Sequence, residues 1–440
     1  MNQNLQKLSF TKSLGFVENT SLFIESNFDK LGNFYKLNLP GHTIYVVIDP
    51  EVLQHVLIRN EENYHKSKIY WGELKKIVGD ALGTVEGEEW LLLKKNQMQA
   101  YTHEKAEKYL DNVLKNSQDF YSQWANENKD LNIIHCFSEL NVFILLNELF
   151  GYENAPLNEL IASYISDGEE IISWRTKFPW RPFTAWINGR NHRTTKYINF
   201  FNNLAQQVIQ ERKQPKEELK KLIDYIIEQS DQNGDSDIVK QKKLRNEIII
   251  HLGAGTETAA VGMGWILYLL HRHPQILNKV RTEVDDLLKG RALCSSDWKK
   301  LPYTEAVIKE SLRLYPPSHA IIRDAQAEDN ILGYPIQKES TLFISAYGLH
   351  RNPRLWEKPN EFIPERFLIE NPTQKYAYIP FGAGRHTCIG RYLAQPMMLL
   401  SLANFVHNYN FEIKVNEPLL PLSLSTLKPN QELNFKIQKR

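Results

Sequence analysis

The chain has 440 residues, 42% of them hydrophobic, and its 53 Lys and Arg residues almost balance its 52 Asp and Glu residues, leaving a formal net charge of +1. This balance argues against a broad nucleic-acid-binding face, and an aromatic content of 11% argues against extensive disorder. Three cysteines are too few for a disulfide scaffold, and the N-terminus shows no apolar run as long as a signal peptide or membrane anchor. We therefore expect a globular cytoplasmic protein that binds neither nucleic acid nor a membrane.

The first half of the chain is predicted to be a β-hairpin followed by helices. Residues 34–48 contain two β-branched runs around the turn dipeptide Pro40-Gly41, which predicts the hairpin. Asp49-Pro50 then predicts a helix start, with Asp as the cap and Pro in the first turn. From about residue 104 to 230, apolar residues recur at helical spacing.

Two stretches interrupt this helical pattern. Trp174 to Trp186 holds two prolines and three tryptophans, and Ser230 to Asp237 is a polar run that predicts a short loop. No internal repeat and no shift in composition marks a domain boundary.

The second half is dominated by one predicted helix from Lys243 to His273. About thirty residues at 1.5 Å each give a helix of roughly 45 Å, long enough to cross the molecule. The remaining predictions are a helix over Thr304–Leu314, short strands at Ile331–Ile336 and Thr341–Ala346, and a last helix over Ile389–His407. The predicted fold class is mainly α with small β-sheets.

A glycine-rich loop surrounds Cys388. The segment from Phe381 to Ala394 reads FGAGRHTCIGRYLA, and three glycines in nine residues let the backbone turn tightly against something flat or bulky. Cys388 lies where the loop becomes a helix, and amide groups at a helix N-terminus favour a thiolate over a thiol.

This loop resembles the cysteine loop of the cytochrome P-450 superfamily, FxxGxRxCxG. Phe381, Gly384, Cys388 and Gly390 match, and His386 stands in the Arg position. The resemblance implies that Cys388 is the axial metal ligand of the iron in haem b, iron protoporphyrin IX. An anionic sulfur pushes electron density onto iron and favours O–O cleavage. It also implies that His386 contacts a haem propionate, with Phe381 and Gly390 beside the cofactor.

The long predicted helix carries a second motif of the same family. The run from Ala254 to Thr258, AGTET, resembles (A/G)Gx(D/E)T in the helix that crosses the distal face of the haem. Activating dioxygen consumes two protons, and a carboxylate beside a hydroxyl, Glu257 and Thr258, can relay them from solvent. Ala254 and Gly255 are expected to leave room for oxygen, and Thr258 can bend the helix by bonding the carbonyl of the preceding turn.

Further matches follow in the family's order. Glu310 and Arg313 form ExxR, and Arg366 belongs to a PERF-like run; by resemblance these three hold the cysteine loop in place. Trp90 and Lys94 have the family's WxxxR spacing, with Lys replacing Arg. Arg323 falls where many members place another cation. We expect Trp90, Lys94 and Arg323 to bind haem propionates.

The residues that line the substrate pocket are expected to include several polar ones. Ser318, His319, His251, and Trp174-Arg175 with Trp180-Arg181 occupy positions where hydrocarbon-binding members would show apolar residues. They predict a polar or sugar-like small-molecule substrate, and a methoxy group on it would allow oxidative O-demethylation. The alternative is a surface or structural placement for these residues.

The resemblance implies a monooxygenase that inserts one oxygen atom of O2 into a C–H bond. Electrons would come from NAD(P)H through a separate ferredoxin and ferredoxin reductase, docking near Arg385 and Arg391. The alternatives are a peroxide-dependent peroxygenase, which the Glu257–Thr258 pair disfavours, and a non-catalytic haem sensor or carrier.

At about 150 residues per domain the length suggests three domains. Motifs between residues 90 and 390 must meet at one haem, however, so we expect a single, monomeric domain over residues 1–440, with haem between a long distal helix and a proximal cysteine loop.

Overall fold

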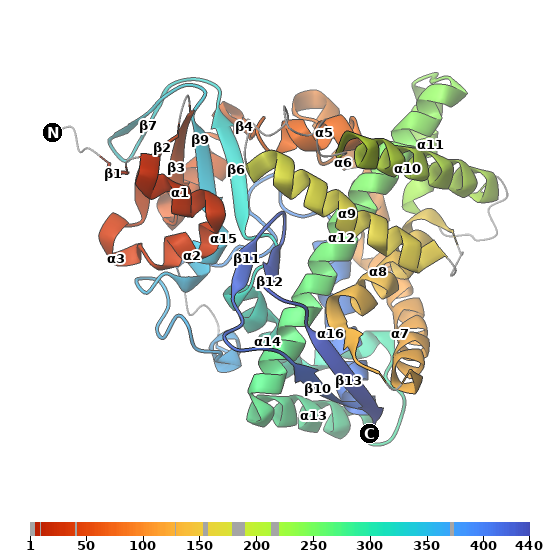
Figure 1. The fold of residues 1–440 in the computed structure, drawn as a ribbon. Coiled ribbons are helices and arrows are strands. Elements are labelled where there is room, and N and C mark those ends of the chain that lie inside the picture. The colour runs from red at the N-terminus through yellow and green to blue at the C-terminus, as the bar shows by residue number, and fades with distance from the viewer. Residues whose placement is uncertain are drawn as a thin grey trace.

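The structure is a computed structural model, shown in Figure 1, that describes residues 5–8, 10–39, 42–127, 129–152, 157–177, 190–212, 220–369 and 374–440. Helices build most of it, and the largest sheet lies on one side together with the short helices α1 (Phe10–Glu18), α2 (Thr20–Glu25) and α3 (Phe28–Leu31). The architecture confirms the predicted fold class, mainly α with small sheets.

The six-stranded sheet joins the N-terminal region of the chain to residues 320–345. Its order is β1-β2-β3-β9-β6-β4, and its strands are β1 (Lys7–Leu8), β2 (Phe34–Leu39), β3 (His42–Val47), β4 (Tyr64–Lys66), β6 (Ala320–Ala325) and β9 (Thr341–Ser345). The antiparallel pair β2–β3 confirms the predicted hairpin, whose turn Pro40-Gly41 lies outside the described residues. Strand β6 was not predicted, and it places the segment after the ExxR motif beside β4.

The first helices follow the sequence signals closely. Asp49 caps α4 (Pro50–Gln54), and its Oδ1 accepts hydrogen bonds from the backbone N–H groups of Glu51 and Val52 at 2.8 and 3.2 Å. The predicted helical region is occupied by α7 (His103–Asn126), α8 (Ile133–Phe150), α9 (Asn158–Lys177), α10 (Arg190–Arg212) and α11 (Leu222–Gln232), preceded by α5 (Trp71–Val78) and α6 (Gly87–Gln97). Of the interruption at 174–186, residues 178–186 lie outside the described residues.

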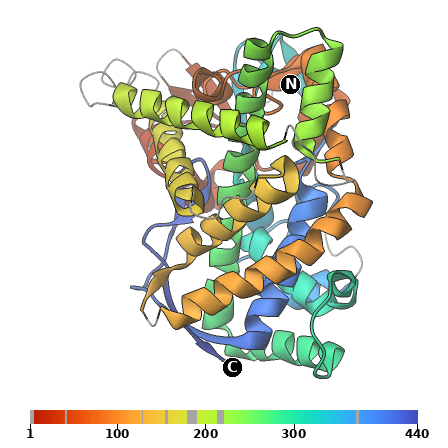
Figure 2. The ribbon, with the colours of Figure 1, turned by 90° about the vertical axis from the view of Figure 1, so that its right-hand side faces the viewer.

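The long helix α12 (Asp237–Arg272) has 36 residues and crosses the molecule (Figures 1 and 2). It begins at Asp237 rather than Lys243, so the predicted loop over residues 230–237 is shorter than expected. Ser236 has an extended backbone with ψ 159°, Asp237 lies in the first turn where its charge suits the helix dipole, and the Lys- and Gln-rich residues that follow favour helix.

Helix α8 packs along α12. Among the described helices it is the one long and apolar enough to cross a membrane, and 72% of its 18 residues are buried inside the protein. The apolar residues all round α8 are thus those of a helix in the protein core.

The chain after α12 forms α13 (Pro274–Leu288), α14 (Pro302–Leu314), α15 (Ala346–Arg351) and α16 (Arg391–Asn408). Two small sheets accompany them: β10 (Tyr409–Lys414), β13 (Asn434–Lys439) and the earlier strand β5 (Leu131–Asn132) in that order, and the pair β11 (Pro421–Ser423) and β12 (Leu427–Pro429). The prediction of one strand over Ile331–Ile336 was wrong. Two strands, β7 (Asp329–Ile331) and β8 (Tyr334–Ile336), form a hairpin instead. Its turn residues Leu332 and Gly333 have φ of 53° and 86°, a backbone that reverses the chain and cannot continue a strand.

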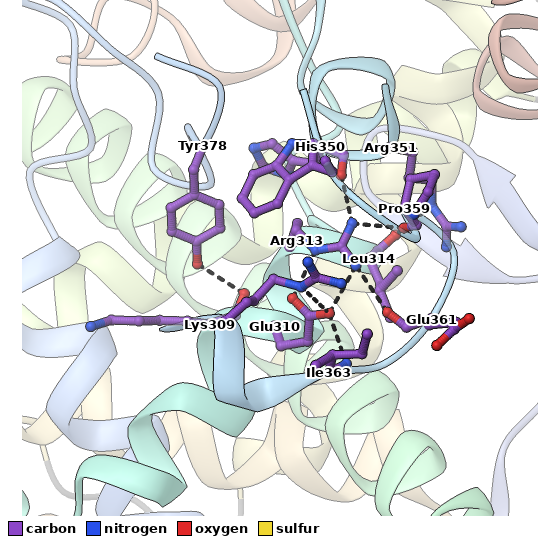
Figure 3. A network of polar contacts seen from close by, with 12 residues as sticks. Lys309, Glu310, Arg313, Leu314, His350, Arg351, Pro359, Glu361, Ile363 and Tyr378 are labelled. Atoms are coloured by element: carbon purple, nitrogen blue, oxygen red, sulfur yellow. Dashed lines mark hydrogen bonds and ion pairs between the residues drawn. The ribbon is translucent and has the colours of Figure 1, made fainter. Parts of the chain in front are cut away.

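A buried charge cluster ties α14 to the segment that leads to the cysteine loop (Figure 3). Arg313 donates from Nε and Nη2 to the Glu310 carboxylate at 2.7 and 2.8 Å, and both side chains are 0% exposed. Arg366 Nε donates to Glu310 Oε1 at 3.1 Å. Arg313 Nη1 also donates to the carbonyls of His350 and Pro359, each at 2.7 Å. The structure therefore brings together the three residues that the motifs single out as structural.

Replacing Glu310 with Gln should destabilise the protein by about 3–5 kcal/mol, because it leaves the positive charges of Arg313 and Arg366 buried without a counter-ion. Urea unfolding followed by tryptophan fluorescence measures the change. The matched control is Glu305→Gln, five residues earlier on α14. Glu305 forms a partly exposed ion pair with Lys309 at 2.8 Å, so this substitution should cost under ~1 kcal/mol. Equal losses in the two variants would contradict this role for Glu310.

Candidate functional site

The cysteine loop is shaped by a close approach of two backbones. Gly384 has φ +72°, and a Cβ at this position would lie 2.1 Å from the carbonyl oxygen of Leu57. No other residue fits, because both the conformation and the backbone contact exclude a side chain. The loop then folds back so that the Cys388 N–H donates to the Phe381 carbonyl at 2.9 Å. Gly390 follows as the N-cap of α16.

The Cys388 thiol is accessible although it lies deep in the protein. Its side chain is exposed, yet burial raises the pKa of the thiol, while hydrogen bonds from the backbone N–H groups of Gly390 and Arg391 lower it. A thiol that is accessible and enclosed faces an interior space. A metal ion bound to the sulfur would deprotonate it outright, which the two N–H donors would assist.

Helix α12 offers a similar interior surface. Ala254 is exposed and Gly253 is half-buried, although Leu252 and Thr256 on either side are buried. Nothing lies within 4 Å of a Cβ built on Gly253. The side of α12 at Gly253 and Ala254 is therefore free of bulky groups.

Gly255 plays a different part from the one expected. A Cβ on Gly255 would lie 2.7 Å from Cδ1 of Leu145 in α8, so this glycine permits close helix packing and does not make room for oxygen. The expectation for Gly255 was wrong because sequence cannot show which side of a helix a neighbour covers.

Thr258 makes the predicted bond to its own helix. Its Oγ1 donates to the Ala254 carbonyl at 2.6 Å, and the side chain is half-buried. A hydroxyl that donates one hydrogen bond can still accept others, so Thr258 Oγ1 can accept a hydrogen bond from a water molecule or a side chain.

Glu257 is held by a distant part of the chain. It is 2% exposed and forms an ion pair with Lys428 of β12 (Leu427–Pro429). Sequence reasoning missed Lys428, because no motif links residue 428 to the long helix.

Aromatic and cationic groups gather at one edge of the cysteine loop. Trp90 of α6 is buried, with its ring centroid 4.0 Å from that of His386. Lys94 Nζ lies 4.8 Å from the Trp90 centroid and donates to the carbonyl of Arg385. The structure thus brings Trp90, Lys94 and His386 together, as the motifs predict.

Lys66 joins this group, and sequence reasoning missed it. In the antiparallel pair of β4 and β6, Lys66 lies directly opposite Arg323, and like charges at such positions destabilise a sheet. Burial lowers the pKa of Lys66 to about 8, with Glu86 raising it and Arg323 lowering it. Burial also lowers the pKa of Arg323 to about 10, against the effect of Glu86 and Asp324. The register of β4 against β6, not a motif, places these charges together.

This cationic cluster consists of Lys66, Lys94, Arg323 and Arg385. Burial and these four charges together lower the pKa of His386 to about 2, so its ring is neutral. His386 Nδ1 is buried without a hydrogen-bond partner, and the Lys66 ammonium uses two of its three donors on the carbonyls of Leu82 and Val85. Unused donors and excess positive charge are the features of an anion site.

These residues fit a haem. Cys388 supplies an enclosed sulfur for iron, the cationic cluster and His386 supply donors for two propionate carboxylates, and α12 supplies a surface free of bulky side chains at Gly253 and Ala254. When bound, the haem supplies the activation of dioxygen.

The polar residues expected to face substrate are mostly occupied elsewhere. His251 is buried with Nδ1 2.8 Å from the Tyr101 hydroxyl and Nε2 2.8 Å from Gln97 Oε1. His319 Nε2 lies 2.9 Å from the Leu424 carbonyl. Sequence shows these residues as polar and does not show that neighbouring elements already bond them.

Arg175 is likewise held within the protein, because its Nε donates to Glu73 Oε2 at 2.8 Å. Ser318 differs: it is exposed, although Pro317 and His319 beside it are buried. The Trp174 side chain, together with Trp180 and Arg181, lies outside the described residues. Ser318 is therefore the described candidate whose side chain stays available to a ligand.

Comparisons with known proteins agree on one family. The model of the family described as Cytochrome P450 matches residues 7–437. The chain is 27% identical to Protein LUTEIN DEFICIENT 5, chloroplastic, from Arabidopsis thaliana, over 97% of this chain and 76% of that protein. It is 26% identical to Cyclooctat-9-en-7-ol 5-monooxygenase from Streptomyces melanosporofaciens, over 86% and 82%. It is 22% identical to Pentalenene oxygenase from Streptomyces avermitilis, over 95% and 93%.

Replacing Lys66 with Met should speed haem loss at least about tenfold, because a hydrogen bond to a charged group contributes ~1.5–3 kcal/mol. Stopped-flow transfer of haem to apomyoglobin measures the rate. Lys68→Met, two residues along the chain at an exposed position, is the control and should leave the rate unchanged. A Lys66→Met protein that holds haem as tightly as the control would remove Lys66 from the propionate site.

Proposed function

Because the chain belongs to the cytochrome P450 family and is therefore a haem-dependent monooxygenase, we propose that it hydroxylates a C–H bond of a small organic substrate with electrons from a separate ferredoxin. One oxygen atom enters the substrate, and the other leaves as water. The observation that carries the proposal is the combination of an enclosed Cys388 thiol, a cationic cluster for propionates, and Thr258 on the open side of α12.

Each of these residues has one task. Cys388 binds the iron through its sulfur, with the N–H groups of Gly390 and Arg391 donating to it. Thr258 can hold a proton-carrying water molecule at Oγ1, because its hydroxyl accepts a hydrogen bond while it donates to the Ala254 carbonyl. Glu257, the preceding residue on α12, supplies a buried carboxylate that can hold a proton. Gly253 and Ala254 of α12 leave space for the substrate, because neither carries a bulky side chain.

A ferredoxin is the electron donor that the charges favour. Lys94, Lys95, Arg385 and Arg391 lie on α6 and around the cysteine loop, and none of the four is buried. An acidic protein would be steered to such a surface and would dock near the iron. A ferredoxin reductase using NAD(P)H would reduce that ferredoxin, and the free cysteines suit the proposed cytoplasmic location.

Two other haem functions are less well supported. A peroxygenase uses peroxide and needs no proton relay, whereas Thr258 and Glu257 are both present here. A haem sensor or carrier needs no accessible surface on α12 at Gly253 and Ala254.

For the substrate, we propose a largely apolar molecule with one hydrogen-bonding group. Ile250 and Ile321 are half-buried, and Ser318 is exposed between buried neighbours. Two relatives are named for pentalenene and cyclooctat-9-en-7-ol, an alkene and an alkenol. The alternative is a sugar-like substrate that undergoes O-demethylation of a methoxy group. Ser318 would favour it if further polar side chains lined the same site.

The substrate proposal predicts which ligands shift the haem spectrum. A cyclic alkenol should bind, and Ser318→Ala should weaken its binding about two- to tenfold, since a neutral hydrogen bond contributes ~0.5–1.5 kcal/mol. The corresponding hydrocarbon is the control, and its affinity should not change with Ser318→Ala. Spectral shifts with sugars and none with alkenols would contradict the proposal.

Replacing Thr258 with Ala should uncouple the reaction. With ferredoxin, product per electron pair should fall at least about tenfold and hydrogen peroxide should rise, because positioned proton transfer is worth ~10²–10⁴-fold in rate. Turnover driven by added peroxide should change far less. The control is Thr256→Ala, which removes a buried hydroxyl two residues away that has no hydrogen-bond partner.

Both variants and the parent protein should give the red-shifted Soret band of a thiolate-bound haem when reduced under carbon monoxide. A parent protein without that band would contradict the proposed function itself. Unchanged coupling in Thr258→Ala would contradict only the proton-transfer role.

A further inference from the structure

Two carboxylates share one lysine behind α12. Lys428 of β12 forms an ion pair with Glu257 of α12, and its Nζ also lies 3.9 Å from Glu169 Oε2 of α9. The side chains are 3% exposed for Glu257, 20% for Lys428 and 15% for Glu169. The three groups come from three elements far apart in the sequence, and Figure 1 shows those elements meeting in the middle of the molecule.

The hairpin that carries Lys428 is anchored to both helices. Strand β12 pairs with β11 (Pro421–Ser423). In the connecting turn, Thr426 Oγ1 donates to Glu169 Oε2 at 3.1 Å, and the Ser425 N–H donates to Ser173 Oγ of α9 at 2.9 Å. On the other side, Trp265 Nε1 of α12 donates to the Leu427 carbonyl at 2.8 Å. The spacing of the three charged groups is therefore set by packing.

The charges of this group do not balance. With both carboxylates ionised and Lys428 protonated, the net charge is −1 in an environment with little water, which is unfavourable. Two carboxylates held close together take up one proton more readily than either would alone. Burial raises the pKa of Glu169 to about 8, with Glu257 raising it further and Lys428 and Thr426 opposing the shift.

The other described groups that face Glu169 do not supply a charge. Tyr70, before α5, has its pKa raised to about 12, first by burial and then by Glu169. Burial and Glu169 also raise the pKa of Tyr197 of α10. Both phenols are neutral at physiological pH, so at Glu169 a proton is what remains to neutralise the charge. On the Glu257 side, the pKa of His135 of α8 is raised, first by its hydrogen bond to Glu139 and least by Glu257.

We propose that Glu169, Lys428 and Glu257 form a proton store, the Glu169 triad, which supplies the reaction through Glu257 and Thr258. The inference rests on the proposed monooxygenase function and assigns Glu169 and Lys428 to it. The Glu169 O–H bond breaks and its proton passes to the Glu257 carboxylate. Glu257 then gives that proton up toward Thr258, and Glu169 takes a replacement from water at its exposed edge. Lys428 lies against both carboxylates and offsets one of their two charges, so one stored proton is enough to balance the triad.

Activity provides the first test. In the haem-loaded protein with ferredoxin, coupling should fall as the pH rises through about 8, where Glu169 loses its proton. Glu169→Gln should lower coupling severalfold at pH 7 and remove this pH dependence. The control is Glu170→Gln, the next residue on α9, whose side chain is 62% exposed and which should behave as the parent. Glu169→Asp keeps the carboxyl group and should restore part of the pH dependence.

Stability provides a second test that does not depend on turnover. Glu169 in the folded state keeps a proton that an ordinary carboxyl releases near pH 4 to 5, so between that pH and about 8 the folded state binds more protons than the unfolded state. The parent should therefore lose stability relative to Glu169→Gln as the pH rises across this window. Thermal unfolding at several pH values measures the difference, and Lys428→Gln should move the upper limit of the window to higher pH.

These outcomes separate the triad from the proposed function. A thiolate Soret band and normal turnover, with Glu169→Gln matching Glu170→Gln in coupling and in the pH dependence of its melting temperature, would overturn the triad and leave the monooxygenase intact. The absence of the thiolate band in the parent would overturn the function, whereas the melting experiment would still report whether Glu169 holds a proton.

Discussion

The buried carboxylate of Glu310 is the group on which the position of the cysteine loop depends. It holds the guanidinium groups of Arg313 and Arg366, and Arg313 in turn bonds the carbonyl of His350. Burial, followed by the charge of Arg313, lowers the pKa of His350 to about 3, so its ring is neutral and Nε2 accepts the N–H of Ile379 at 2.8 Å. Ile379 lies two residues before the loop. A chain of bonds therefore runs from one carboxylate to the segment that carries Cys388.

Such a cluster contributes more to geometry than to net stability. Removing charges from water costs several kcal/mol for each ion, and the ion pairs and backbone carbonyls offset that cost only when every partner is in place. The loop is consequently held in one arrangement, and Gly384, which touches the Leu57 carbonyl, has no room to shift. A metal ligand benefits from this rigidity because its sulfur must meet the iron at one position.

Charge is distributed unequally around the site. Cations gather where β4 and β6 meet the cysteine loop, and there Lys66 faces Arg323. Behind α12 the balance is reversed, because Glu257 and Glu169 share one lysine. The excess of positive charge near the cysteine loop favours binding of the cofactor's carboxylates. The excess of negative charge beside Lys428 favours uptake of a proton. Both are costly for the chain alone, and costly arrangements of charge are concentrated at functional sites.

Sequence alone identifies the chemistry-bearing residues that have a local signature: Cys388 with its glycines, Glu257-Thr258 on a long helix, and the pair Glu310 and Arg313. Their spacing within a loop or a helical turn decides their geometry, so a motif reports it. Which groups meet from distant segments follows from the folded chain, because strand register and helix packing depend on the whole core. The tertiary structure added Lys66 opposite Arg323 and Lys428 against Glu257, and turned Gly255 toward Leu145. It also gave His251 and His319 partners within the protein, since a polar residue in a sequence does not show what it already bonds.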